Sequence, residues 1–173
     1  LQALCVPQVP SIEREPNDSR EQAMIIREGF VGGCINGEED QDRFAIEMKK
    51  GMKLQAAIHS AALGLTLDAS LRVEGPDGKQ LAENDDYDGK PDPRVTWTAP
   101  VDGFYQIVVR DTLQHGGEKC HYVLGVSAPQ PSVMLTLAAP QKLSVKAGET
   151  TSVKFAIKRI DGWNQPLVVR VSG

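Results

Sequence analysis

The sequence is poor in aromatic residues and has no surplus of basic ones. Only 5% of its 173 residues are Phe, Trp or Tyr, a small supply for stacking against sugars or nucleobases. Lys and Arg number 19 against 23 for Asp and Glu, which gives a net charge of −4 and a pI near 5.4. The basic residues are scattered along the chain. This pattern argues against nucleic acid and anionic membranes as partners.

Long apolar runs and the common catalytic motifs are also missing. No apolar stretch is long enough to span a bilayer, and residues 1–7 lack the basic and apolar regions of an intact signal peptide. The histidines His59, His115 and His121 are far apart and have no H-E-x-x-H spacing. No G-x-S-x-G elbow and no phosphate-binding glycine loop occurs. We therefore expect a protein that is not itself an enzyme.

Cysteine is scarce, with three residues, Cys5, Cys34 and Cys120, at spacings that do not suit a metal site. A disulfide between Cys34 and Cys120 requires that their strands be neighbours. The alternative, which the odd count favours, is that the cysteines are free or buried thiols. Cysteine usage therefore does not decide the compartment.

Turn residues and short alternating segments are abundant. The 16 Gly and 11 Pro indicate many turns, and short apolar-alternating runs recur between them. The clearest run, residues 104–109, places Phe104 and Tyr105 on opposite faces of a strand. Repeated short strands predict an all-β fold, an antiparallel sandwich or barrel. The predicted strands are residues 30–35, 43–48, 54–58, 68–74, 95–98, 104–109 and 120–126, with a further one from Leu81.

One segment, residues 17–26, carries a helical signal. Asp18 or Ser19 can cap a helix, and Glu21 is favourable in a first turn. The segment predicts about one helical turn.

A composition break at residues 128–131 divides the chain. Residues 1–11 contain two prolines, lack periodicity and read as a linker, and residues 12–128 hold the sandwich. Residues 129–173 show about four strands, short of the roughly seven of an immunoglobulin-type sandwich. We interpret them as the first strands of an incomplete further domain. The predicted strands are 133–137, 143–145, 152–157 and 167–171, with a turn at 147–150.

An ordered series of short motifs covers residues 12–126. It comprises E-R-E-P-N-D at 13–18, Gly33, D-x-D-x-F at 40–44, Gly51, D-x-x-L at 68–71, D-G at 77–78, N-D-D at 84–86, D-G-F-Y at 102–105 and Y-V-L at 122–124. In this order and at these spacings, the series resembles the bacterial pre-peptidase C-terminal domain family. Residues 147–150 and 158–163 resemble the start of an Ig-like repeat from large bacterial surface proteins.

The first resemblance implies a jelly-roll-like β-sandwich that accompanies secreted proteases and other extracellular bacterial proteins. The clostridial collagenase relatives bind collagen and hold calcium at the N-terminal linker. The strand that begins at Phe104 has no aromatic residue beyond Tyr105, which argues against collagen binding here. By motif match, the implied calcium ligands are Glu13, Glu15, Asn17, Asp18 and Asp42. Glu39 is a sixth candidate because the family often has Asp there, and Asp40 is interpreted as a turn residue.

The residue types suit that metal. Calcium takes about six to eight oxygen ligands, and Glu13 and Glu15 alternate on a segment that Pro16 helps to keep extended. Converging carboxylates would repel one another and raise their pKa values, which a cation would relieve. The alternative is a set of exposed acids and helix caps. The second acid-rich stretch, residues 84–92, lacks the EF-hand pattern and is interpreted as a polar loop with Asx turns.

The sequence therefore predicts a non-catalytic accessory module with one calcium site, in a secreted or cell-surface bacterial protein. The expected role is targeting, spacing or adhesion toward an unknown extracellular protein or polysaccharide. The expected location is extracellular, periplasmic or on the cell surface. The alternative is a substrate- or polysaccharide-binding module that serves an enzyme elsewhere in the full-length chain.

Overall fold

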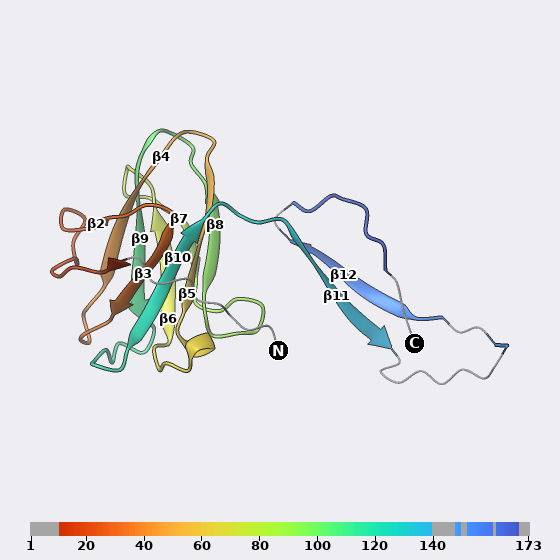
Figure 1. Cartoon of the computed structure of the whole chain (residues 1–173). Helices are drawn as coiled ribbons and strands as arrows, with labels where there is room; N and C mark the ends of the chain where they lie inside the picture. Colours follow the sequence, from red (N-terminus) through yellow and green to blue (C-terminus); the bar gives the residue numbers. More distant parts are fainter. Residues whose placement is uncertain (1–10, 140–147, 150–151, 161, 170–173) are drawn as a thin grey trace. The chain divides into compact units, whose positions relative to one another are not determined.

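Two five-stranded sheets form the first part of the chain (Figure 1). The computed structural model describes residues 11–139, 148–149, 152–160 and 162–169. The chain divides into two compact units, Leu1–Ala128 and Pro129–Gly173. Sheet A has the order β1 (Ser11–Ile12), β3 (Gly29–Cys34), β10 (His121–Ser127), β5 (Lys53–His59) and β8 (Arg94–Thr98). Sheet B has the order β2 (Met24–Ile25), β4 (Asp42–Met48), β9 (Gly103–Asp111), β6 (Ala69–Glu74) and β7 (Gln80–Asn84).

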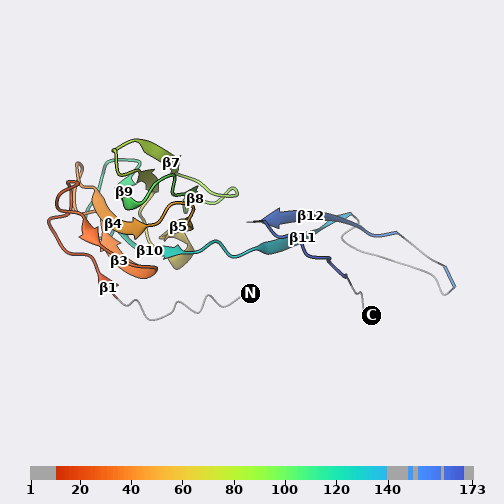
Figure 2. The same ribbon diagram turned by 90° about the horizontal axis from the view of Figure 1, so that it is seen from above.

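The strand order is that of a jelly roll. From β3 to β10, consecutive strands alternate between the sheets except at the β6–β7 hairpin, and every pair among them is antiparallel. The predicted all-β, jelly-roll-like sandwich is therefore confirmed. The two short N-terminal strands differ from the antiparallel prediction, because β1 pairs parallel to β3 and β2 pairs parallel to β4. Figure 2 shows the two layers from above.

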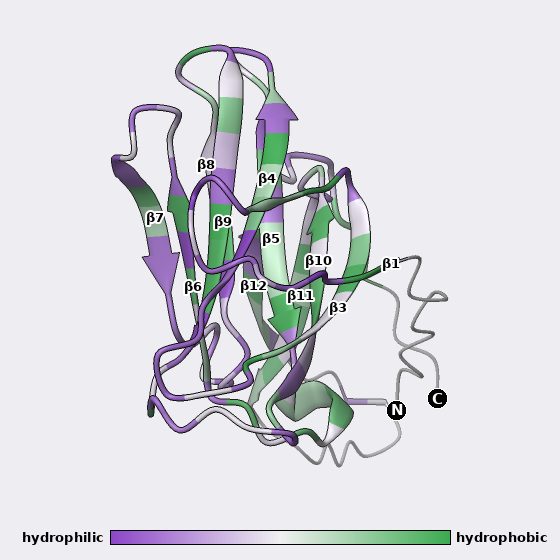
Figure 3. Ribbon diagram, turned by 90° about the vertical axis from the view of Figure 1, so that its left-hand side faces the viewer, coloured by the Kyte–Doolittle hydropathy of each residue, from purple (hydrophilic) through white to green (hydrophobic). Residues whose placement is uncertain are grey.

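The core lies between the sheets, where the period-two pattern of each strand directs its apolar residues. In β4, Phe44, Ile46 and Met48 are all buried. In β9, Tyr105 is fully buried and its hydroxyl donates to the Val101 carbonyl at 2.7 Å, whereas Phe104 is 47% exposed. The predicted opposite faces of these two residues are confirmed. Figure 3 shows the hydrophobic and hydrophilic parts of the strands in the two sheets.

The helical turn predicted within residues 17–26 is wrong. The segment instead makes one tight turn, in which the Gln22 N–H donates to the Ser19 carbonyl at 3.1 Å, and then forms β2. Ile26 continues the pairing by donating to the Ala45 carbonyl at 2.9 Å, and its side chain is buried. Pairing with β4 and burial of Ile26 therefore outweigh the local capping signal, as tertiary contacts often do.

Cys34, the last residue of β3, and Cys120, just before β10, are free thiols. Cys34 lies opposite the exposed His121, whereas Cys120 packs against the core. No disulfide joins the two residues. Cys5 lies outside the described residues.

The second unit contains an antiparallel pair, β11 (Ser132–Ala139) and β12 (Lys154–Ile160). These strands confirm the predictions for 133–137 and 152–157. A strand over 167–171 is not formed at residues 167–169, which have no pairing partner among the described residues. Residues 143–145 and two residues of the 147–150 turn lie outside the described residues. The Ig-like resemblance of this unit stays a prediction.

No helix among the described residues is long and apolar enough to cross a membrane.

Candidate metal centre

The segment between β1 and β2 connects an edge of sheet A with an edge of sheet B. The Glu13 N–H extends the β1 pairing by donating to the Gly32 carbonyl at 2.9 Å. The peptide bond between Glu15 and Pro16 is cis. This path carries residues 13–18 past the starting point of β4, where Asp42 faces into the sandwich.

Three carboxylates converge there, those of Glu13, Glu15 and Asp42, which we call the acidic cluster. Each offers one oxygen, and the three oxygens lie within 4.8 Å of one another. Asp42 is fully buried, Glu13 is half-buried and Glu15 is exposed. The Cys34 N–H donates to Glu13 Oε1 at 2.6 Å, which ties this carboxylate to β3. The acidic cluster thus joins the N-terminal segment to both sheets.

Tyr122 contributes a buried hydroxyl to the acidic cluster. Its Oη lies 3.3 Å from Glu13 Oε2 and also hydrogen-bonds Asp42 Oδ2. Gly33 makes room for this ring, since a Cβ at Gly33 would lie 2.3 Å from Tyr122 Oη and 2.7 Å from Glu13 Oε2. The Gly33 and Tyr122 motifs of the sequence therefore meet at one point, opposite each other in the β3–β10 pairing.

Within the described part of the chain, no basic side chain forms an ion pair with the acidic cluster. Asp42 Oδ1 is buried and has no hydrogen-bond partner among the described residues. Burial, together with the hydrogen bond to Glu13, raises the pKa of the Asp42 carboxyl to about 9. Burial also raises the pKa of the Tyr122 hydroxyl, with a further contribution from the charges of Asp42 and Glu13. A bound cation would stabilise the ionised carboxylates.

Asn17 lies beside the acidic cluster with its polar atoms buried. Its backbone N–H donates to Glu15 Oε2 at 3.0 Å. Its side chain is fully buried, and neither the amide oxygen nor the amide nitrogen has a partner among the described residues. A buried, unpaired amide is costly, which makes its oxygen available as a ligand.

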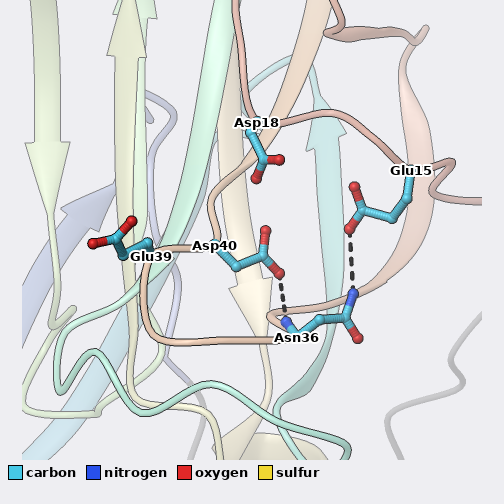
Figure 4. A pocket seen from close by; sticks show the side chains of 5 residues that line it. All are labelled: Glu15, Asp18, Asn36, Glu39 and Asp40. Atoms are coloured by element: carbon cyan, nitrogen blue, oxygen red, sulfur yellow. Dashed lines mark hydrogen bonds between the residues drawn. The ribbon is translucent and has the colours of Figure 1, made fainter.

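An open depression of about 550 Å³ adjoins the acidic cluster and shares Glu15 with it. The carboxylates of Glu15, Asp18 and Asp40 extend into the space between them, whereas the Glu39 side chain turns away (Figure 4). Asn36 donates through its amide nitrogen to Glu15 Oε1 at 3.2 Å and through its backbone N–H to Asp40. Burial raises the pKa of Asp40, and the hydrogen bond to Asp18 and the charge of Glu15 add to the increase.

The structure gathers the predicted ligands to different degrees. Glu13, Glu15 and Asp42 form the acidic cluster, and Asn17 is bonded to it. Asp18 lines the neighbouring depression. Glu39 lines the same depression with its carboxylate turned away from the other acids.

Three participants were not among the predicted ligands. Asp40 lies in the turn, as predicted, where its N–H donates to the Gly37 carbonyl at 3.3 Å, but its side chain also lines the depression. Asn36 had no signal in the sequence. For Tyr122, the alternation of its strand in the sequence predicts a buried side chain. It does not predict which groups the hydroxyl contacts.

The second acid-rich stretch has a structural role. Asp92 Oδ1 accepts from the Ser60 and Ala61 N–H groups, both at 2.9 Å, and Oδ2 accepts from the Ala62 N–H at 2.8 Å. These bonds cap the short 3₁₀ helix η1 (Ala61–Leu63). Asp85 and Asp86 are exposed.

Comparison with known proteins agrees with the motif series. Residues 40–111 match the model of the bacterial pre-peptidase C-terminal domain, which confirms the predicted resemblance. The chain is also similar to a probable subtilase-type serine protease of Deinococcus radiodurans, with 37% identity over 99 residues, which are 55% of this chain. The match covers 14% of that protein's length.

Two solved structures are similar to the chain. One is the pre-peptidase C-terminal domain of collagenase from Bacillus anthracis, with 12% identity and a TM-score of 0.47, covering 66% of this chain and 100% of that one. The other is Aeromonas hydrophila PliG, a periplasmic inhibitor of g-type lysozyme, with 18% identity and a TM-score of 0.49, covering 61% of this chain and 94% of that one.

Proposed function

We propose that residues 12–128 form a non-catalytic, calcium-stabilised accessory module of a secreted or cell-surface bacterial protein, acting in targeting, spacing or adhesion. The family match at residues 40–111 supports an accessory role. The similar subtilase-type protease supports an extracellular setting, with the catalytic part of such a protein lying elsewhere in its chain.

The observation that carries the calcium proposal is the convergence of the acidic cluster around a buried, unpartnered Asp42 oxygen. Glu13, Glu15 and Asp42 would hold the ion, with the Asn17 amide oxygen as a fourth ligand. Asp18 and water would complete the coordination. All of these donors are oxygens, the ligands that calcium prefers.

A softer metal fits the centre less well. The nearest sulfur candidate is Cys34, whose N–H binds Glu13. The Cys34 thiol donates to the Gly117 carbonyl at 3.5 Å, so its sulfur already has another partner.

The ion would fasten the N-terminal segment to the sandwich. Glu13 is bonded to β3 and to Tyr122 of β10 in sheet A, whereas Asp42 begins β4 in sheet B. An ion shared by these groups binds the folded state only, because the unfolded chain does not bring them together. Calcium therefore adds its binding free energy to the stability of the module.

Thermal melting with calcium and with a chelator tests the proposal. Calcium at 100 times its dissociation constant should add about 2.7 kcal/mol, which corresponds to a rise of about 8 °C in the melting temperature of a domain this size. Glu15→Ala should abolish most of that rise without unfolding the protein, because Glu15 is exposed. Asp42→Ala should abolish it as well.

Glu21→Ala is the matched control, since it removes an exposed glutamate from the same connection outside the acidic cluster. It should keep the full calcium response. A wild-type protein that melts at the same temperature in calcium and in chelator, or a Glu15→Ala variant with an unchanged response, would contradict the proposal.

The alternative function, a module that binds substrate or polysaccharide for an enzyme elsewhere in the full-length chain, is favoured by one observation. A hollow on sheet B is lined mainly by polar side chains.

A further inference from the structure

The outer face of sheet B carries a group of arginines. Arg43 of β4 and Arg72 of β6 lie on either side of Val108 of β9, and Arg110 follows two residues along the same strand. Val108 is only 1% exposed although it faces outward, because long arginine stems can cover apolar surface. The arginines gather here although the whole chain has a net charge of −4.

The arginines have too few acidic partners. Glu74 is the shared partner of Arg20, Arg43 and Arg72, at 3.8, 3.0 and 3.0 Å. Arg110 directs both Nε, at 2.8 Å, and Nη2 toward one neutral atom, Gln41 Oε1. Within the described part of the chain, Arg110 has no carboxylate at ion-pair distance. Burial, and then the charges of Arg72 and Arg43, lower the pKa of Arg110, and the charges of Glu74 and Glu83 partly oppose that decrease.

A hollow of about 650 Å³ borders this arginine group. Two of its lining residues are cross-strand neighbours of the arginines, since Ser70 pairs with Arg110 and Glu83 pairs with Arg72. A third, Asn84, pairs with the buried Leu71, so its side chain faces the interior of the sandwich at the edge of the hollow. The full lining is Ser70, Gln80, Leu81, Ala82, Glu83, Asn84, Asp85 and Thr112.

The lining chemistry suits the hydroxyl groups of a sugar. Hydroxyl, amide and carboxylate side chains can donate to or accept from them, and no aromatic ring lines the hollow for stacking. Recognition there would depend on hydrogen bonds, in agreement with the low aromatic content of the chain.

We propose that this face of sheet B binds an acidic oligosaccharide, with a uronate carboxylate on Arg110 and Arg72 and the adjoining neutral sugars in the hollow. A guanidinium group binds a carboxylate through two parallel hydrogen bonds. Glu83 and Asp85 would repel a second carboxylate in the hollow. The ligand is therefore a sugar chain with an isolated acidic unit, and an acidic peptide or a uniformly charged polymer fits less well.

The experiment compares two probes that differ in one acidic unit. An aldotetraouronic acid, in which a methylglucuronic acid is attached to xylotriose, and neutral xylotetraose are titrated calorimetrically into the full chain in calcium buffer. The acidic sugar should bind at least tenfold more tightly. Raising the salt concentration from 0.05 to 0.5 M should weaken the binding of the acidic sugar only, since salt screens the attraction between the uronate and the arginines.

Arg110→Gln should lower the affinity for the acidic sugar to that for xylotetraose, and Ser70→Ala should weaken the binding of both sugars. Arg27→Gln makes the same charge change at an exposed arginine outside this face and should keep the preference. Circular dichroism melting establishes that each variant is folded.

Three results would overturn the assignment: no binding of either sugar, equal binding of both, or an unchanged preference in folded Arg110→Gln. Tighter binding of an acidic pentapeptide, Ser-Gly-Glu-Gly-Ser, than of the acidic sugar would also overturn it in favour of a peptide partner. The site is independent of the calcium proposal, so Glu15→Ala should bind both sugars as the wild type does. A failure of one proposal is therefore distinguishable from a failure of the other.

Discussion

Two acid-rich stretches of this chain look alike in sequence and differ in the folded protein. In residues 84–92, Asp92 accepts three backbone N–H groups, and both of its oxygens are paired. In the acidic cluster, the buried Asp42 leaves one oxygen without a partner and faces two other carboxylates. The first arrangement uses a carboxylate to complete the backbone hydrogen bonding. The second collects negative charge that the described residues do not neutralise.

The difference lies in the donors that each carboxylate meets. Asp111 repeats the first arrangement, since it accepts from the N–H groups of Leu113, His115 and Gly116. Backbone donors stabilise the ionised form of a carboxylate without a metal. A metal site is therefore indicated by acids that meet one another, and not by the number of acids in a stretch.

Gly33→Ala should have the largest effect on the acidic cluster. The added Cβ would lie 2.3 Å from the Tyr122 hydroxyl, so the ring and Glu13 must move. Overpacking of this kind costs about 3 kcal/mol. Urea unfolding in chelator should show this loss of stability. The additional stability gained in calcium should also be smaller than in the wild type.

Gly37→Ala is its control, because a Cβ at Gly37 meets nothing within 4 Å. It should change the free energy of unfolding by less than about 0.5 kcal/mol. If Gly33→Ala were as stable as Gly37→Ala, Tyr122 would not be held in its described position.

Asp92→Ala should have an intermediate effect and separate the two acid-rich stretches. Loss of three hydrogen bonds to a charged group should lower the free energy of unfolding by about 2 kcal/mol. The same loss is expected in calcium and in chelator, as measured by urea unfolding. Asp86→Ala, at an exposed position of the same loop, should be close to neutral. A calcium-dependent loss in Asp92→Ala would show that the second stretch also binds metal.

Glu39→Gln should have the smallest effect. The Glu39 carboxylate turns away from Asp18 and Asp40 (Figure 4), so its neutralisation should change stability by less than about 0.5 kcal/mol in either buffer. The measurement is a pair of melting curves, in calcium and in chelator, recorded in parallel with those of Glu15→Ala. If Glu39→Gln lost as much calcium response as Glu15→Ala, Glu39 would be a ligand that reorients on binding.

Much of the sandwich could be predicted because its strands follow a period of two. Phe44, Ile46 and Met48 recur at every second position of the sequence and are buried in the structure. The residues 17–26 could not be predicted in the same way. Their capping signal is local, whereas β2 depends on pairing with β4, which is distant in sequence.

The acidic cluster was predictable in its members but not in its geometry. Glu13, Glu15 and Asp42 belong to motifs that could be matched one by one. The hydroxyl of Tyr122 reaches them only because Gly33 lies opposite it in the β3–β10 register. The outward turn of Glu39 and the capping role of Asp92 depend on loop conformations that carry no periodic signal.

The hydrogen bond between Tyr122 and Glu13 joins residues that are 109 positions apart. Between them lie eight of the strands of the sandwich, β2 to β9. A nascent chain that has not yet released β10 lacks the Tyr122 hydroxyl, and its β3 lacks the neighbour that aligns Gly33. The Tyr122 hydroxyl therefore joins the acidic cluster only when β10 is paired with β3.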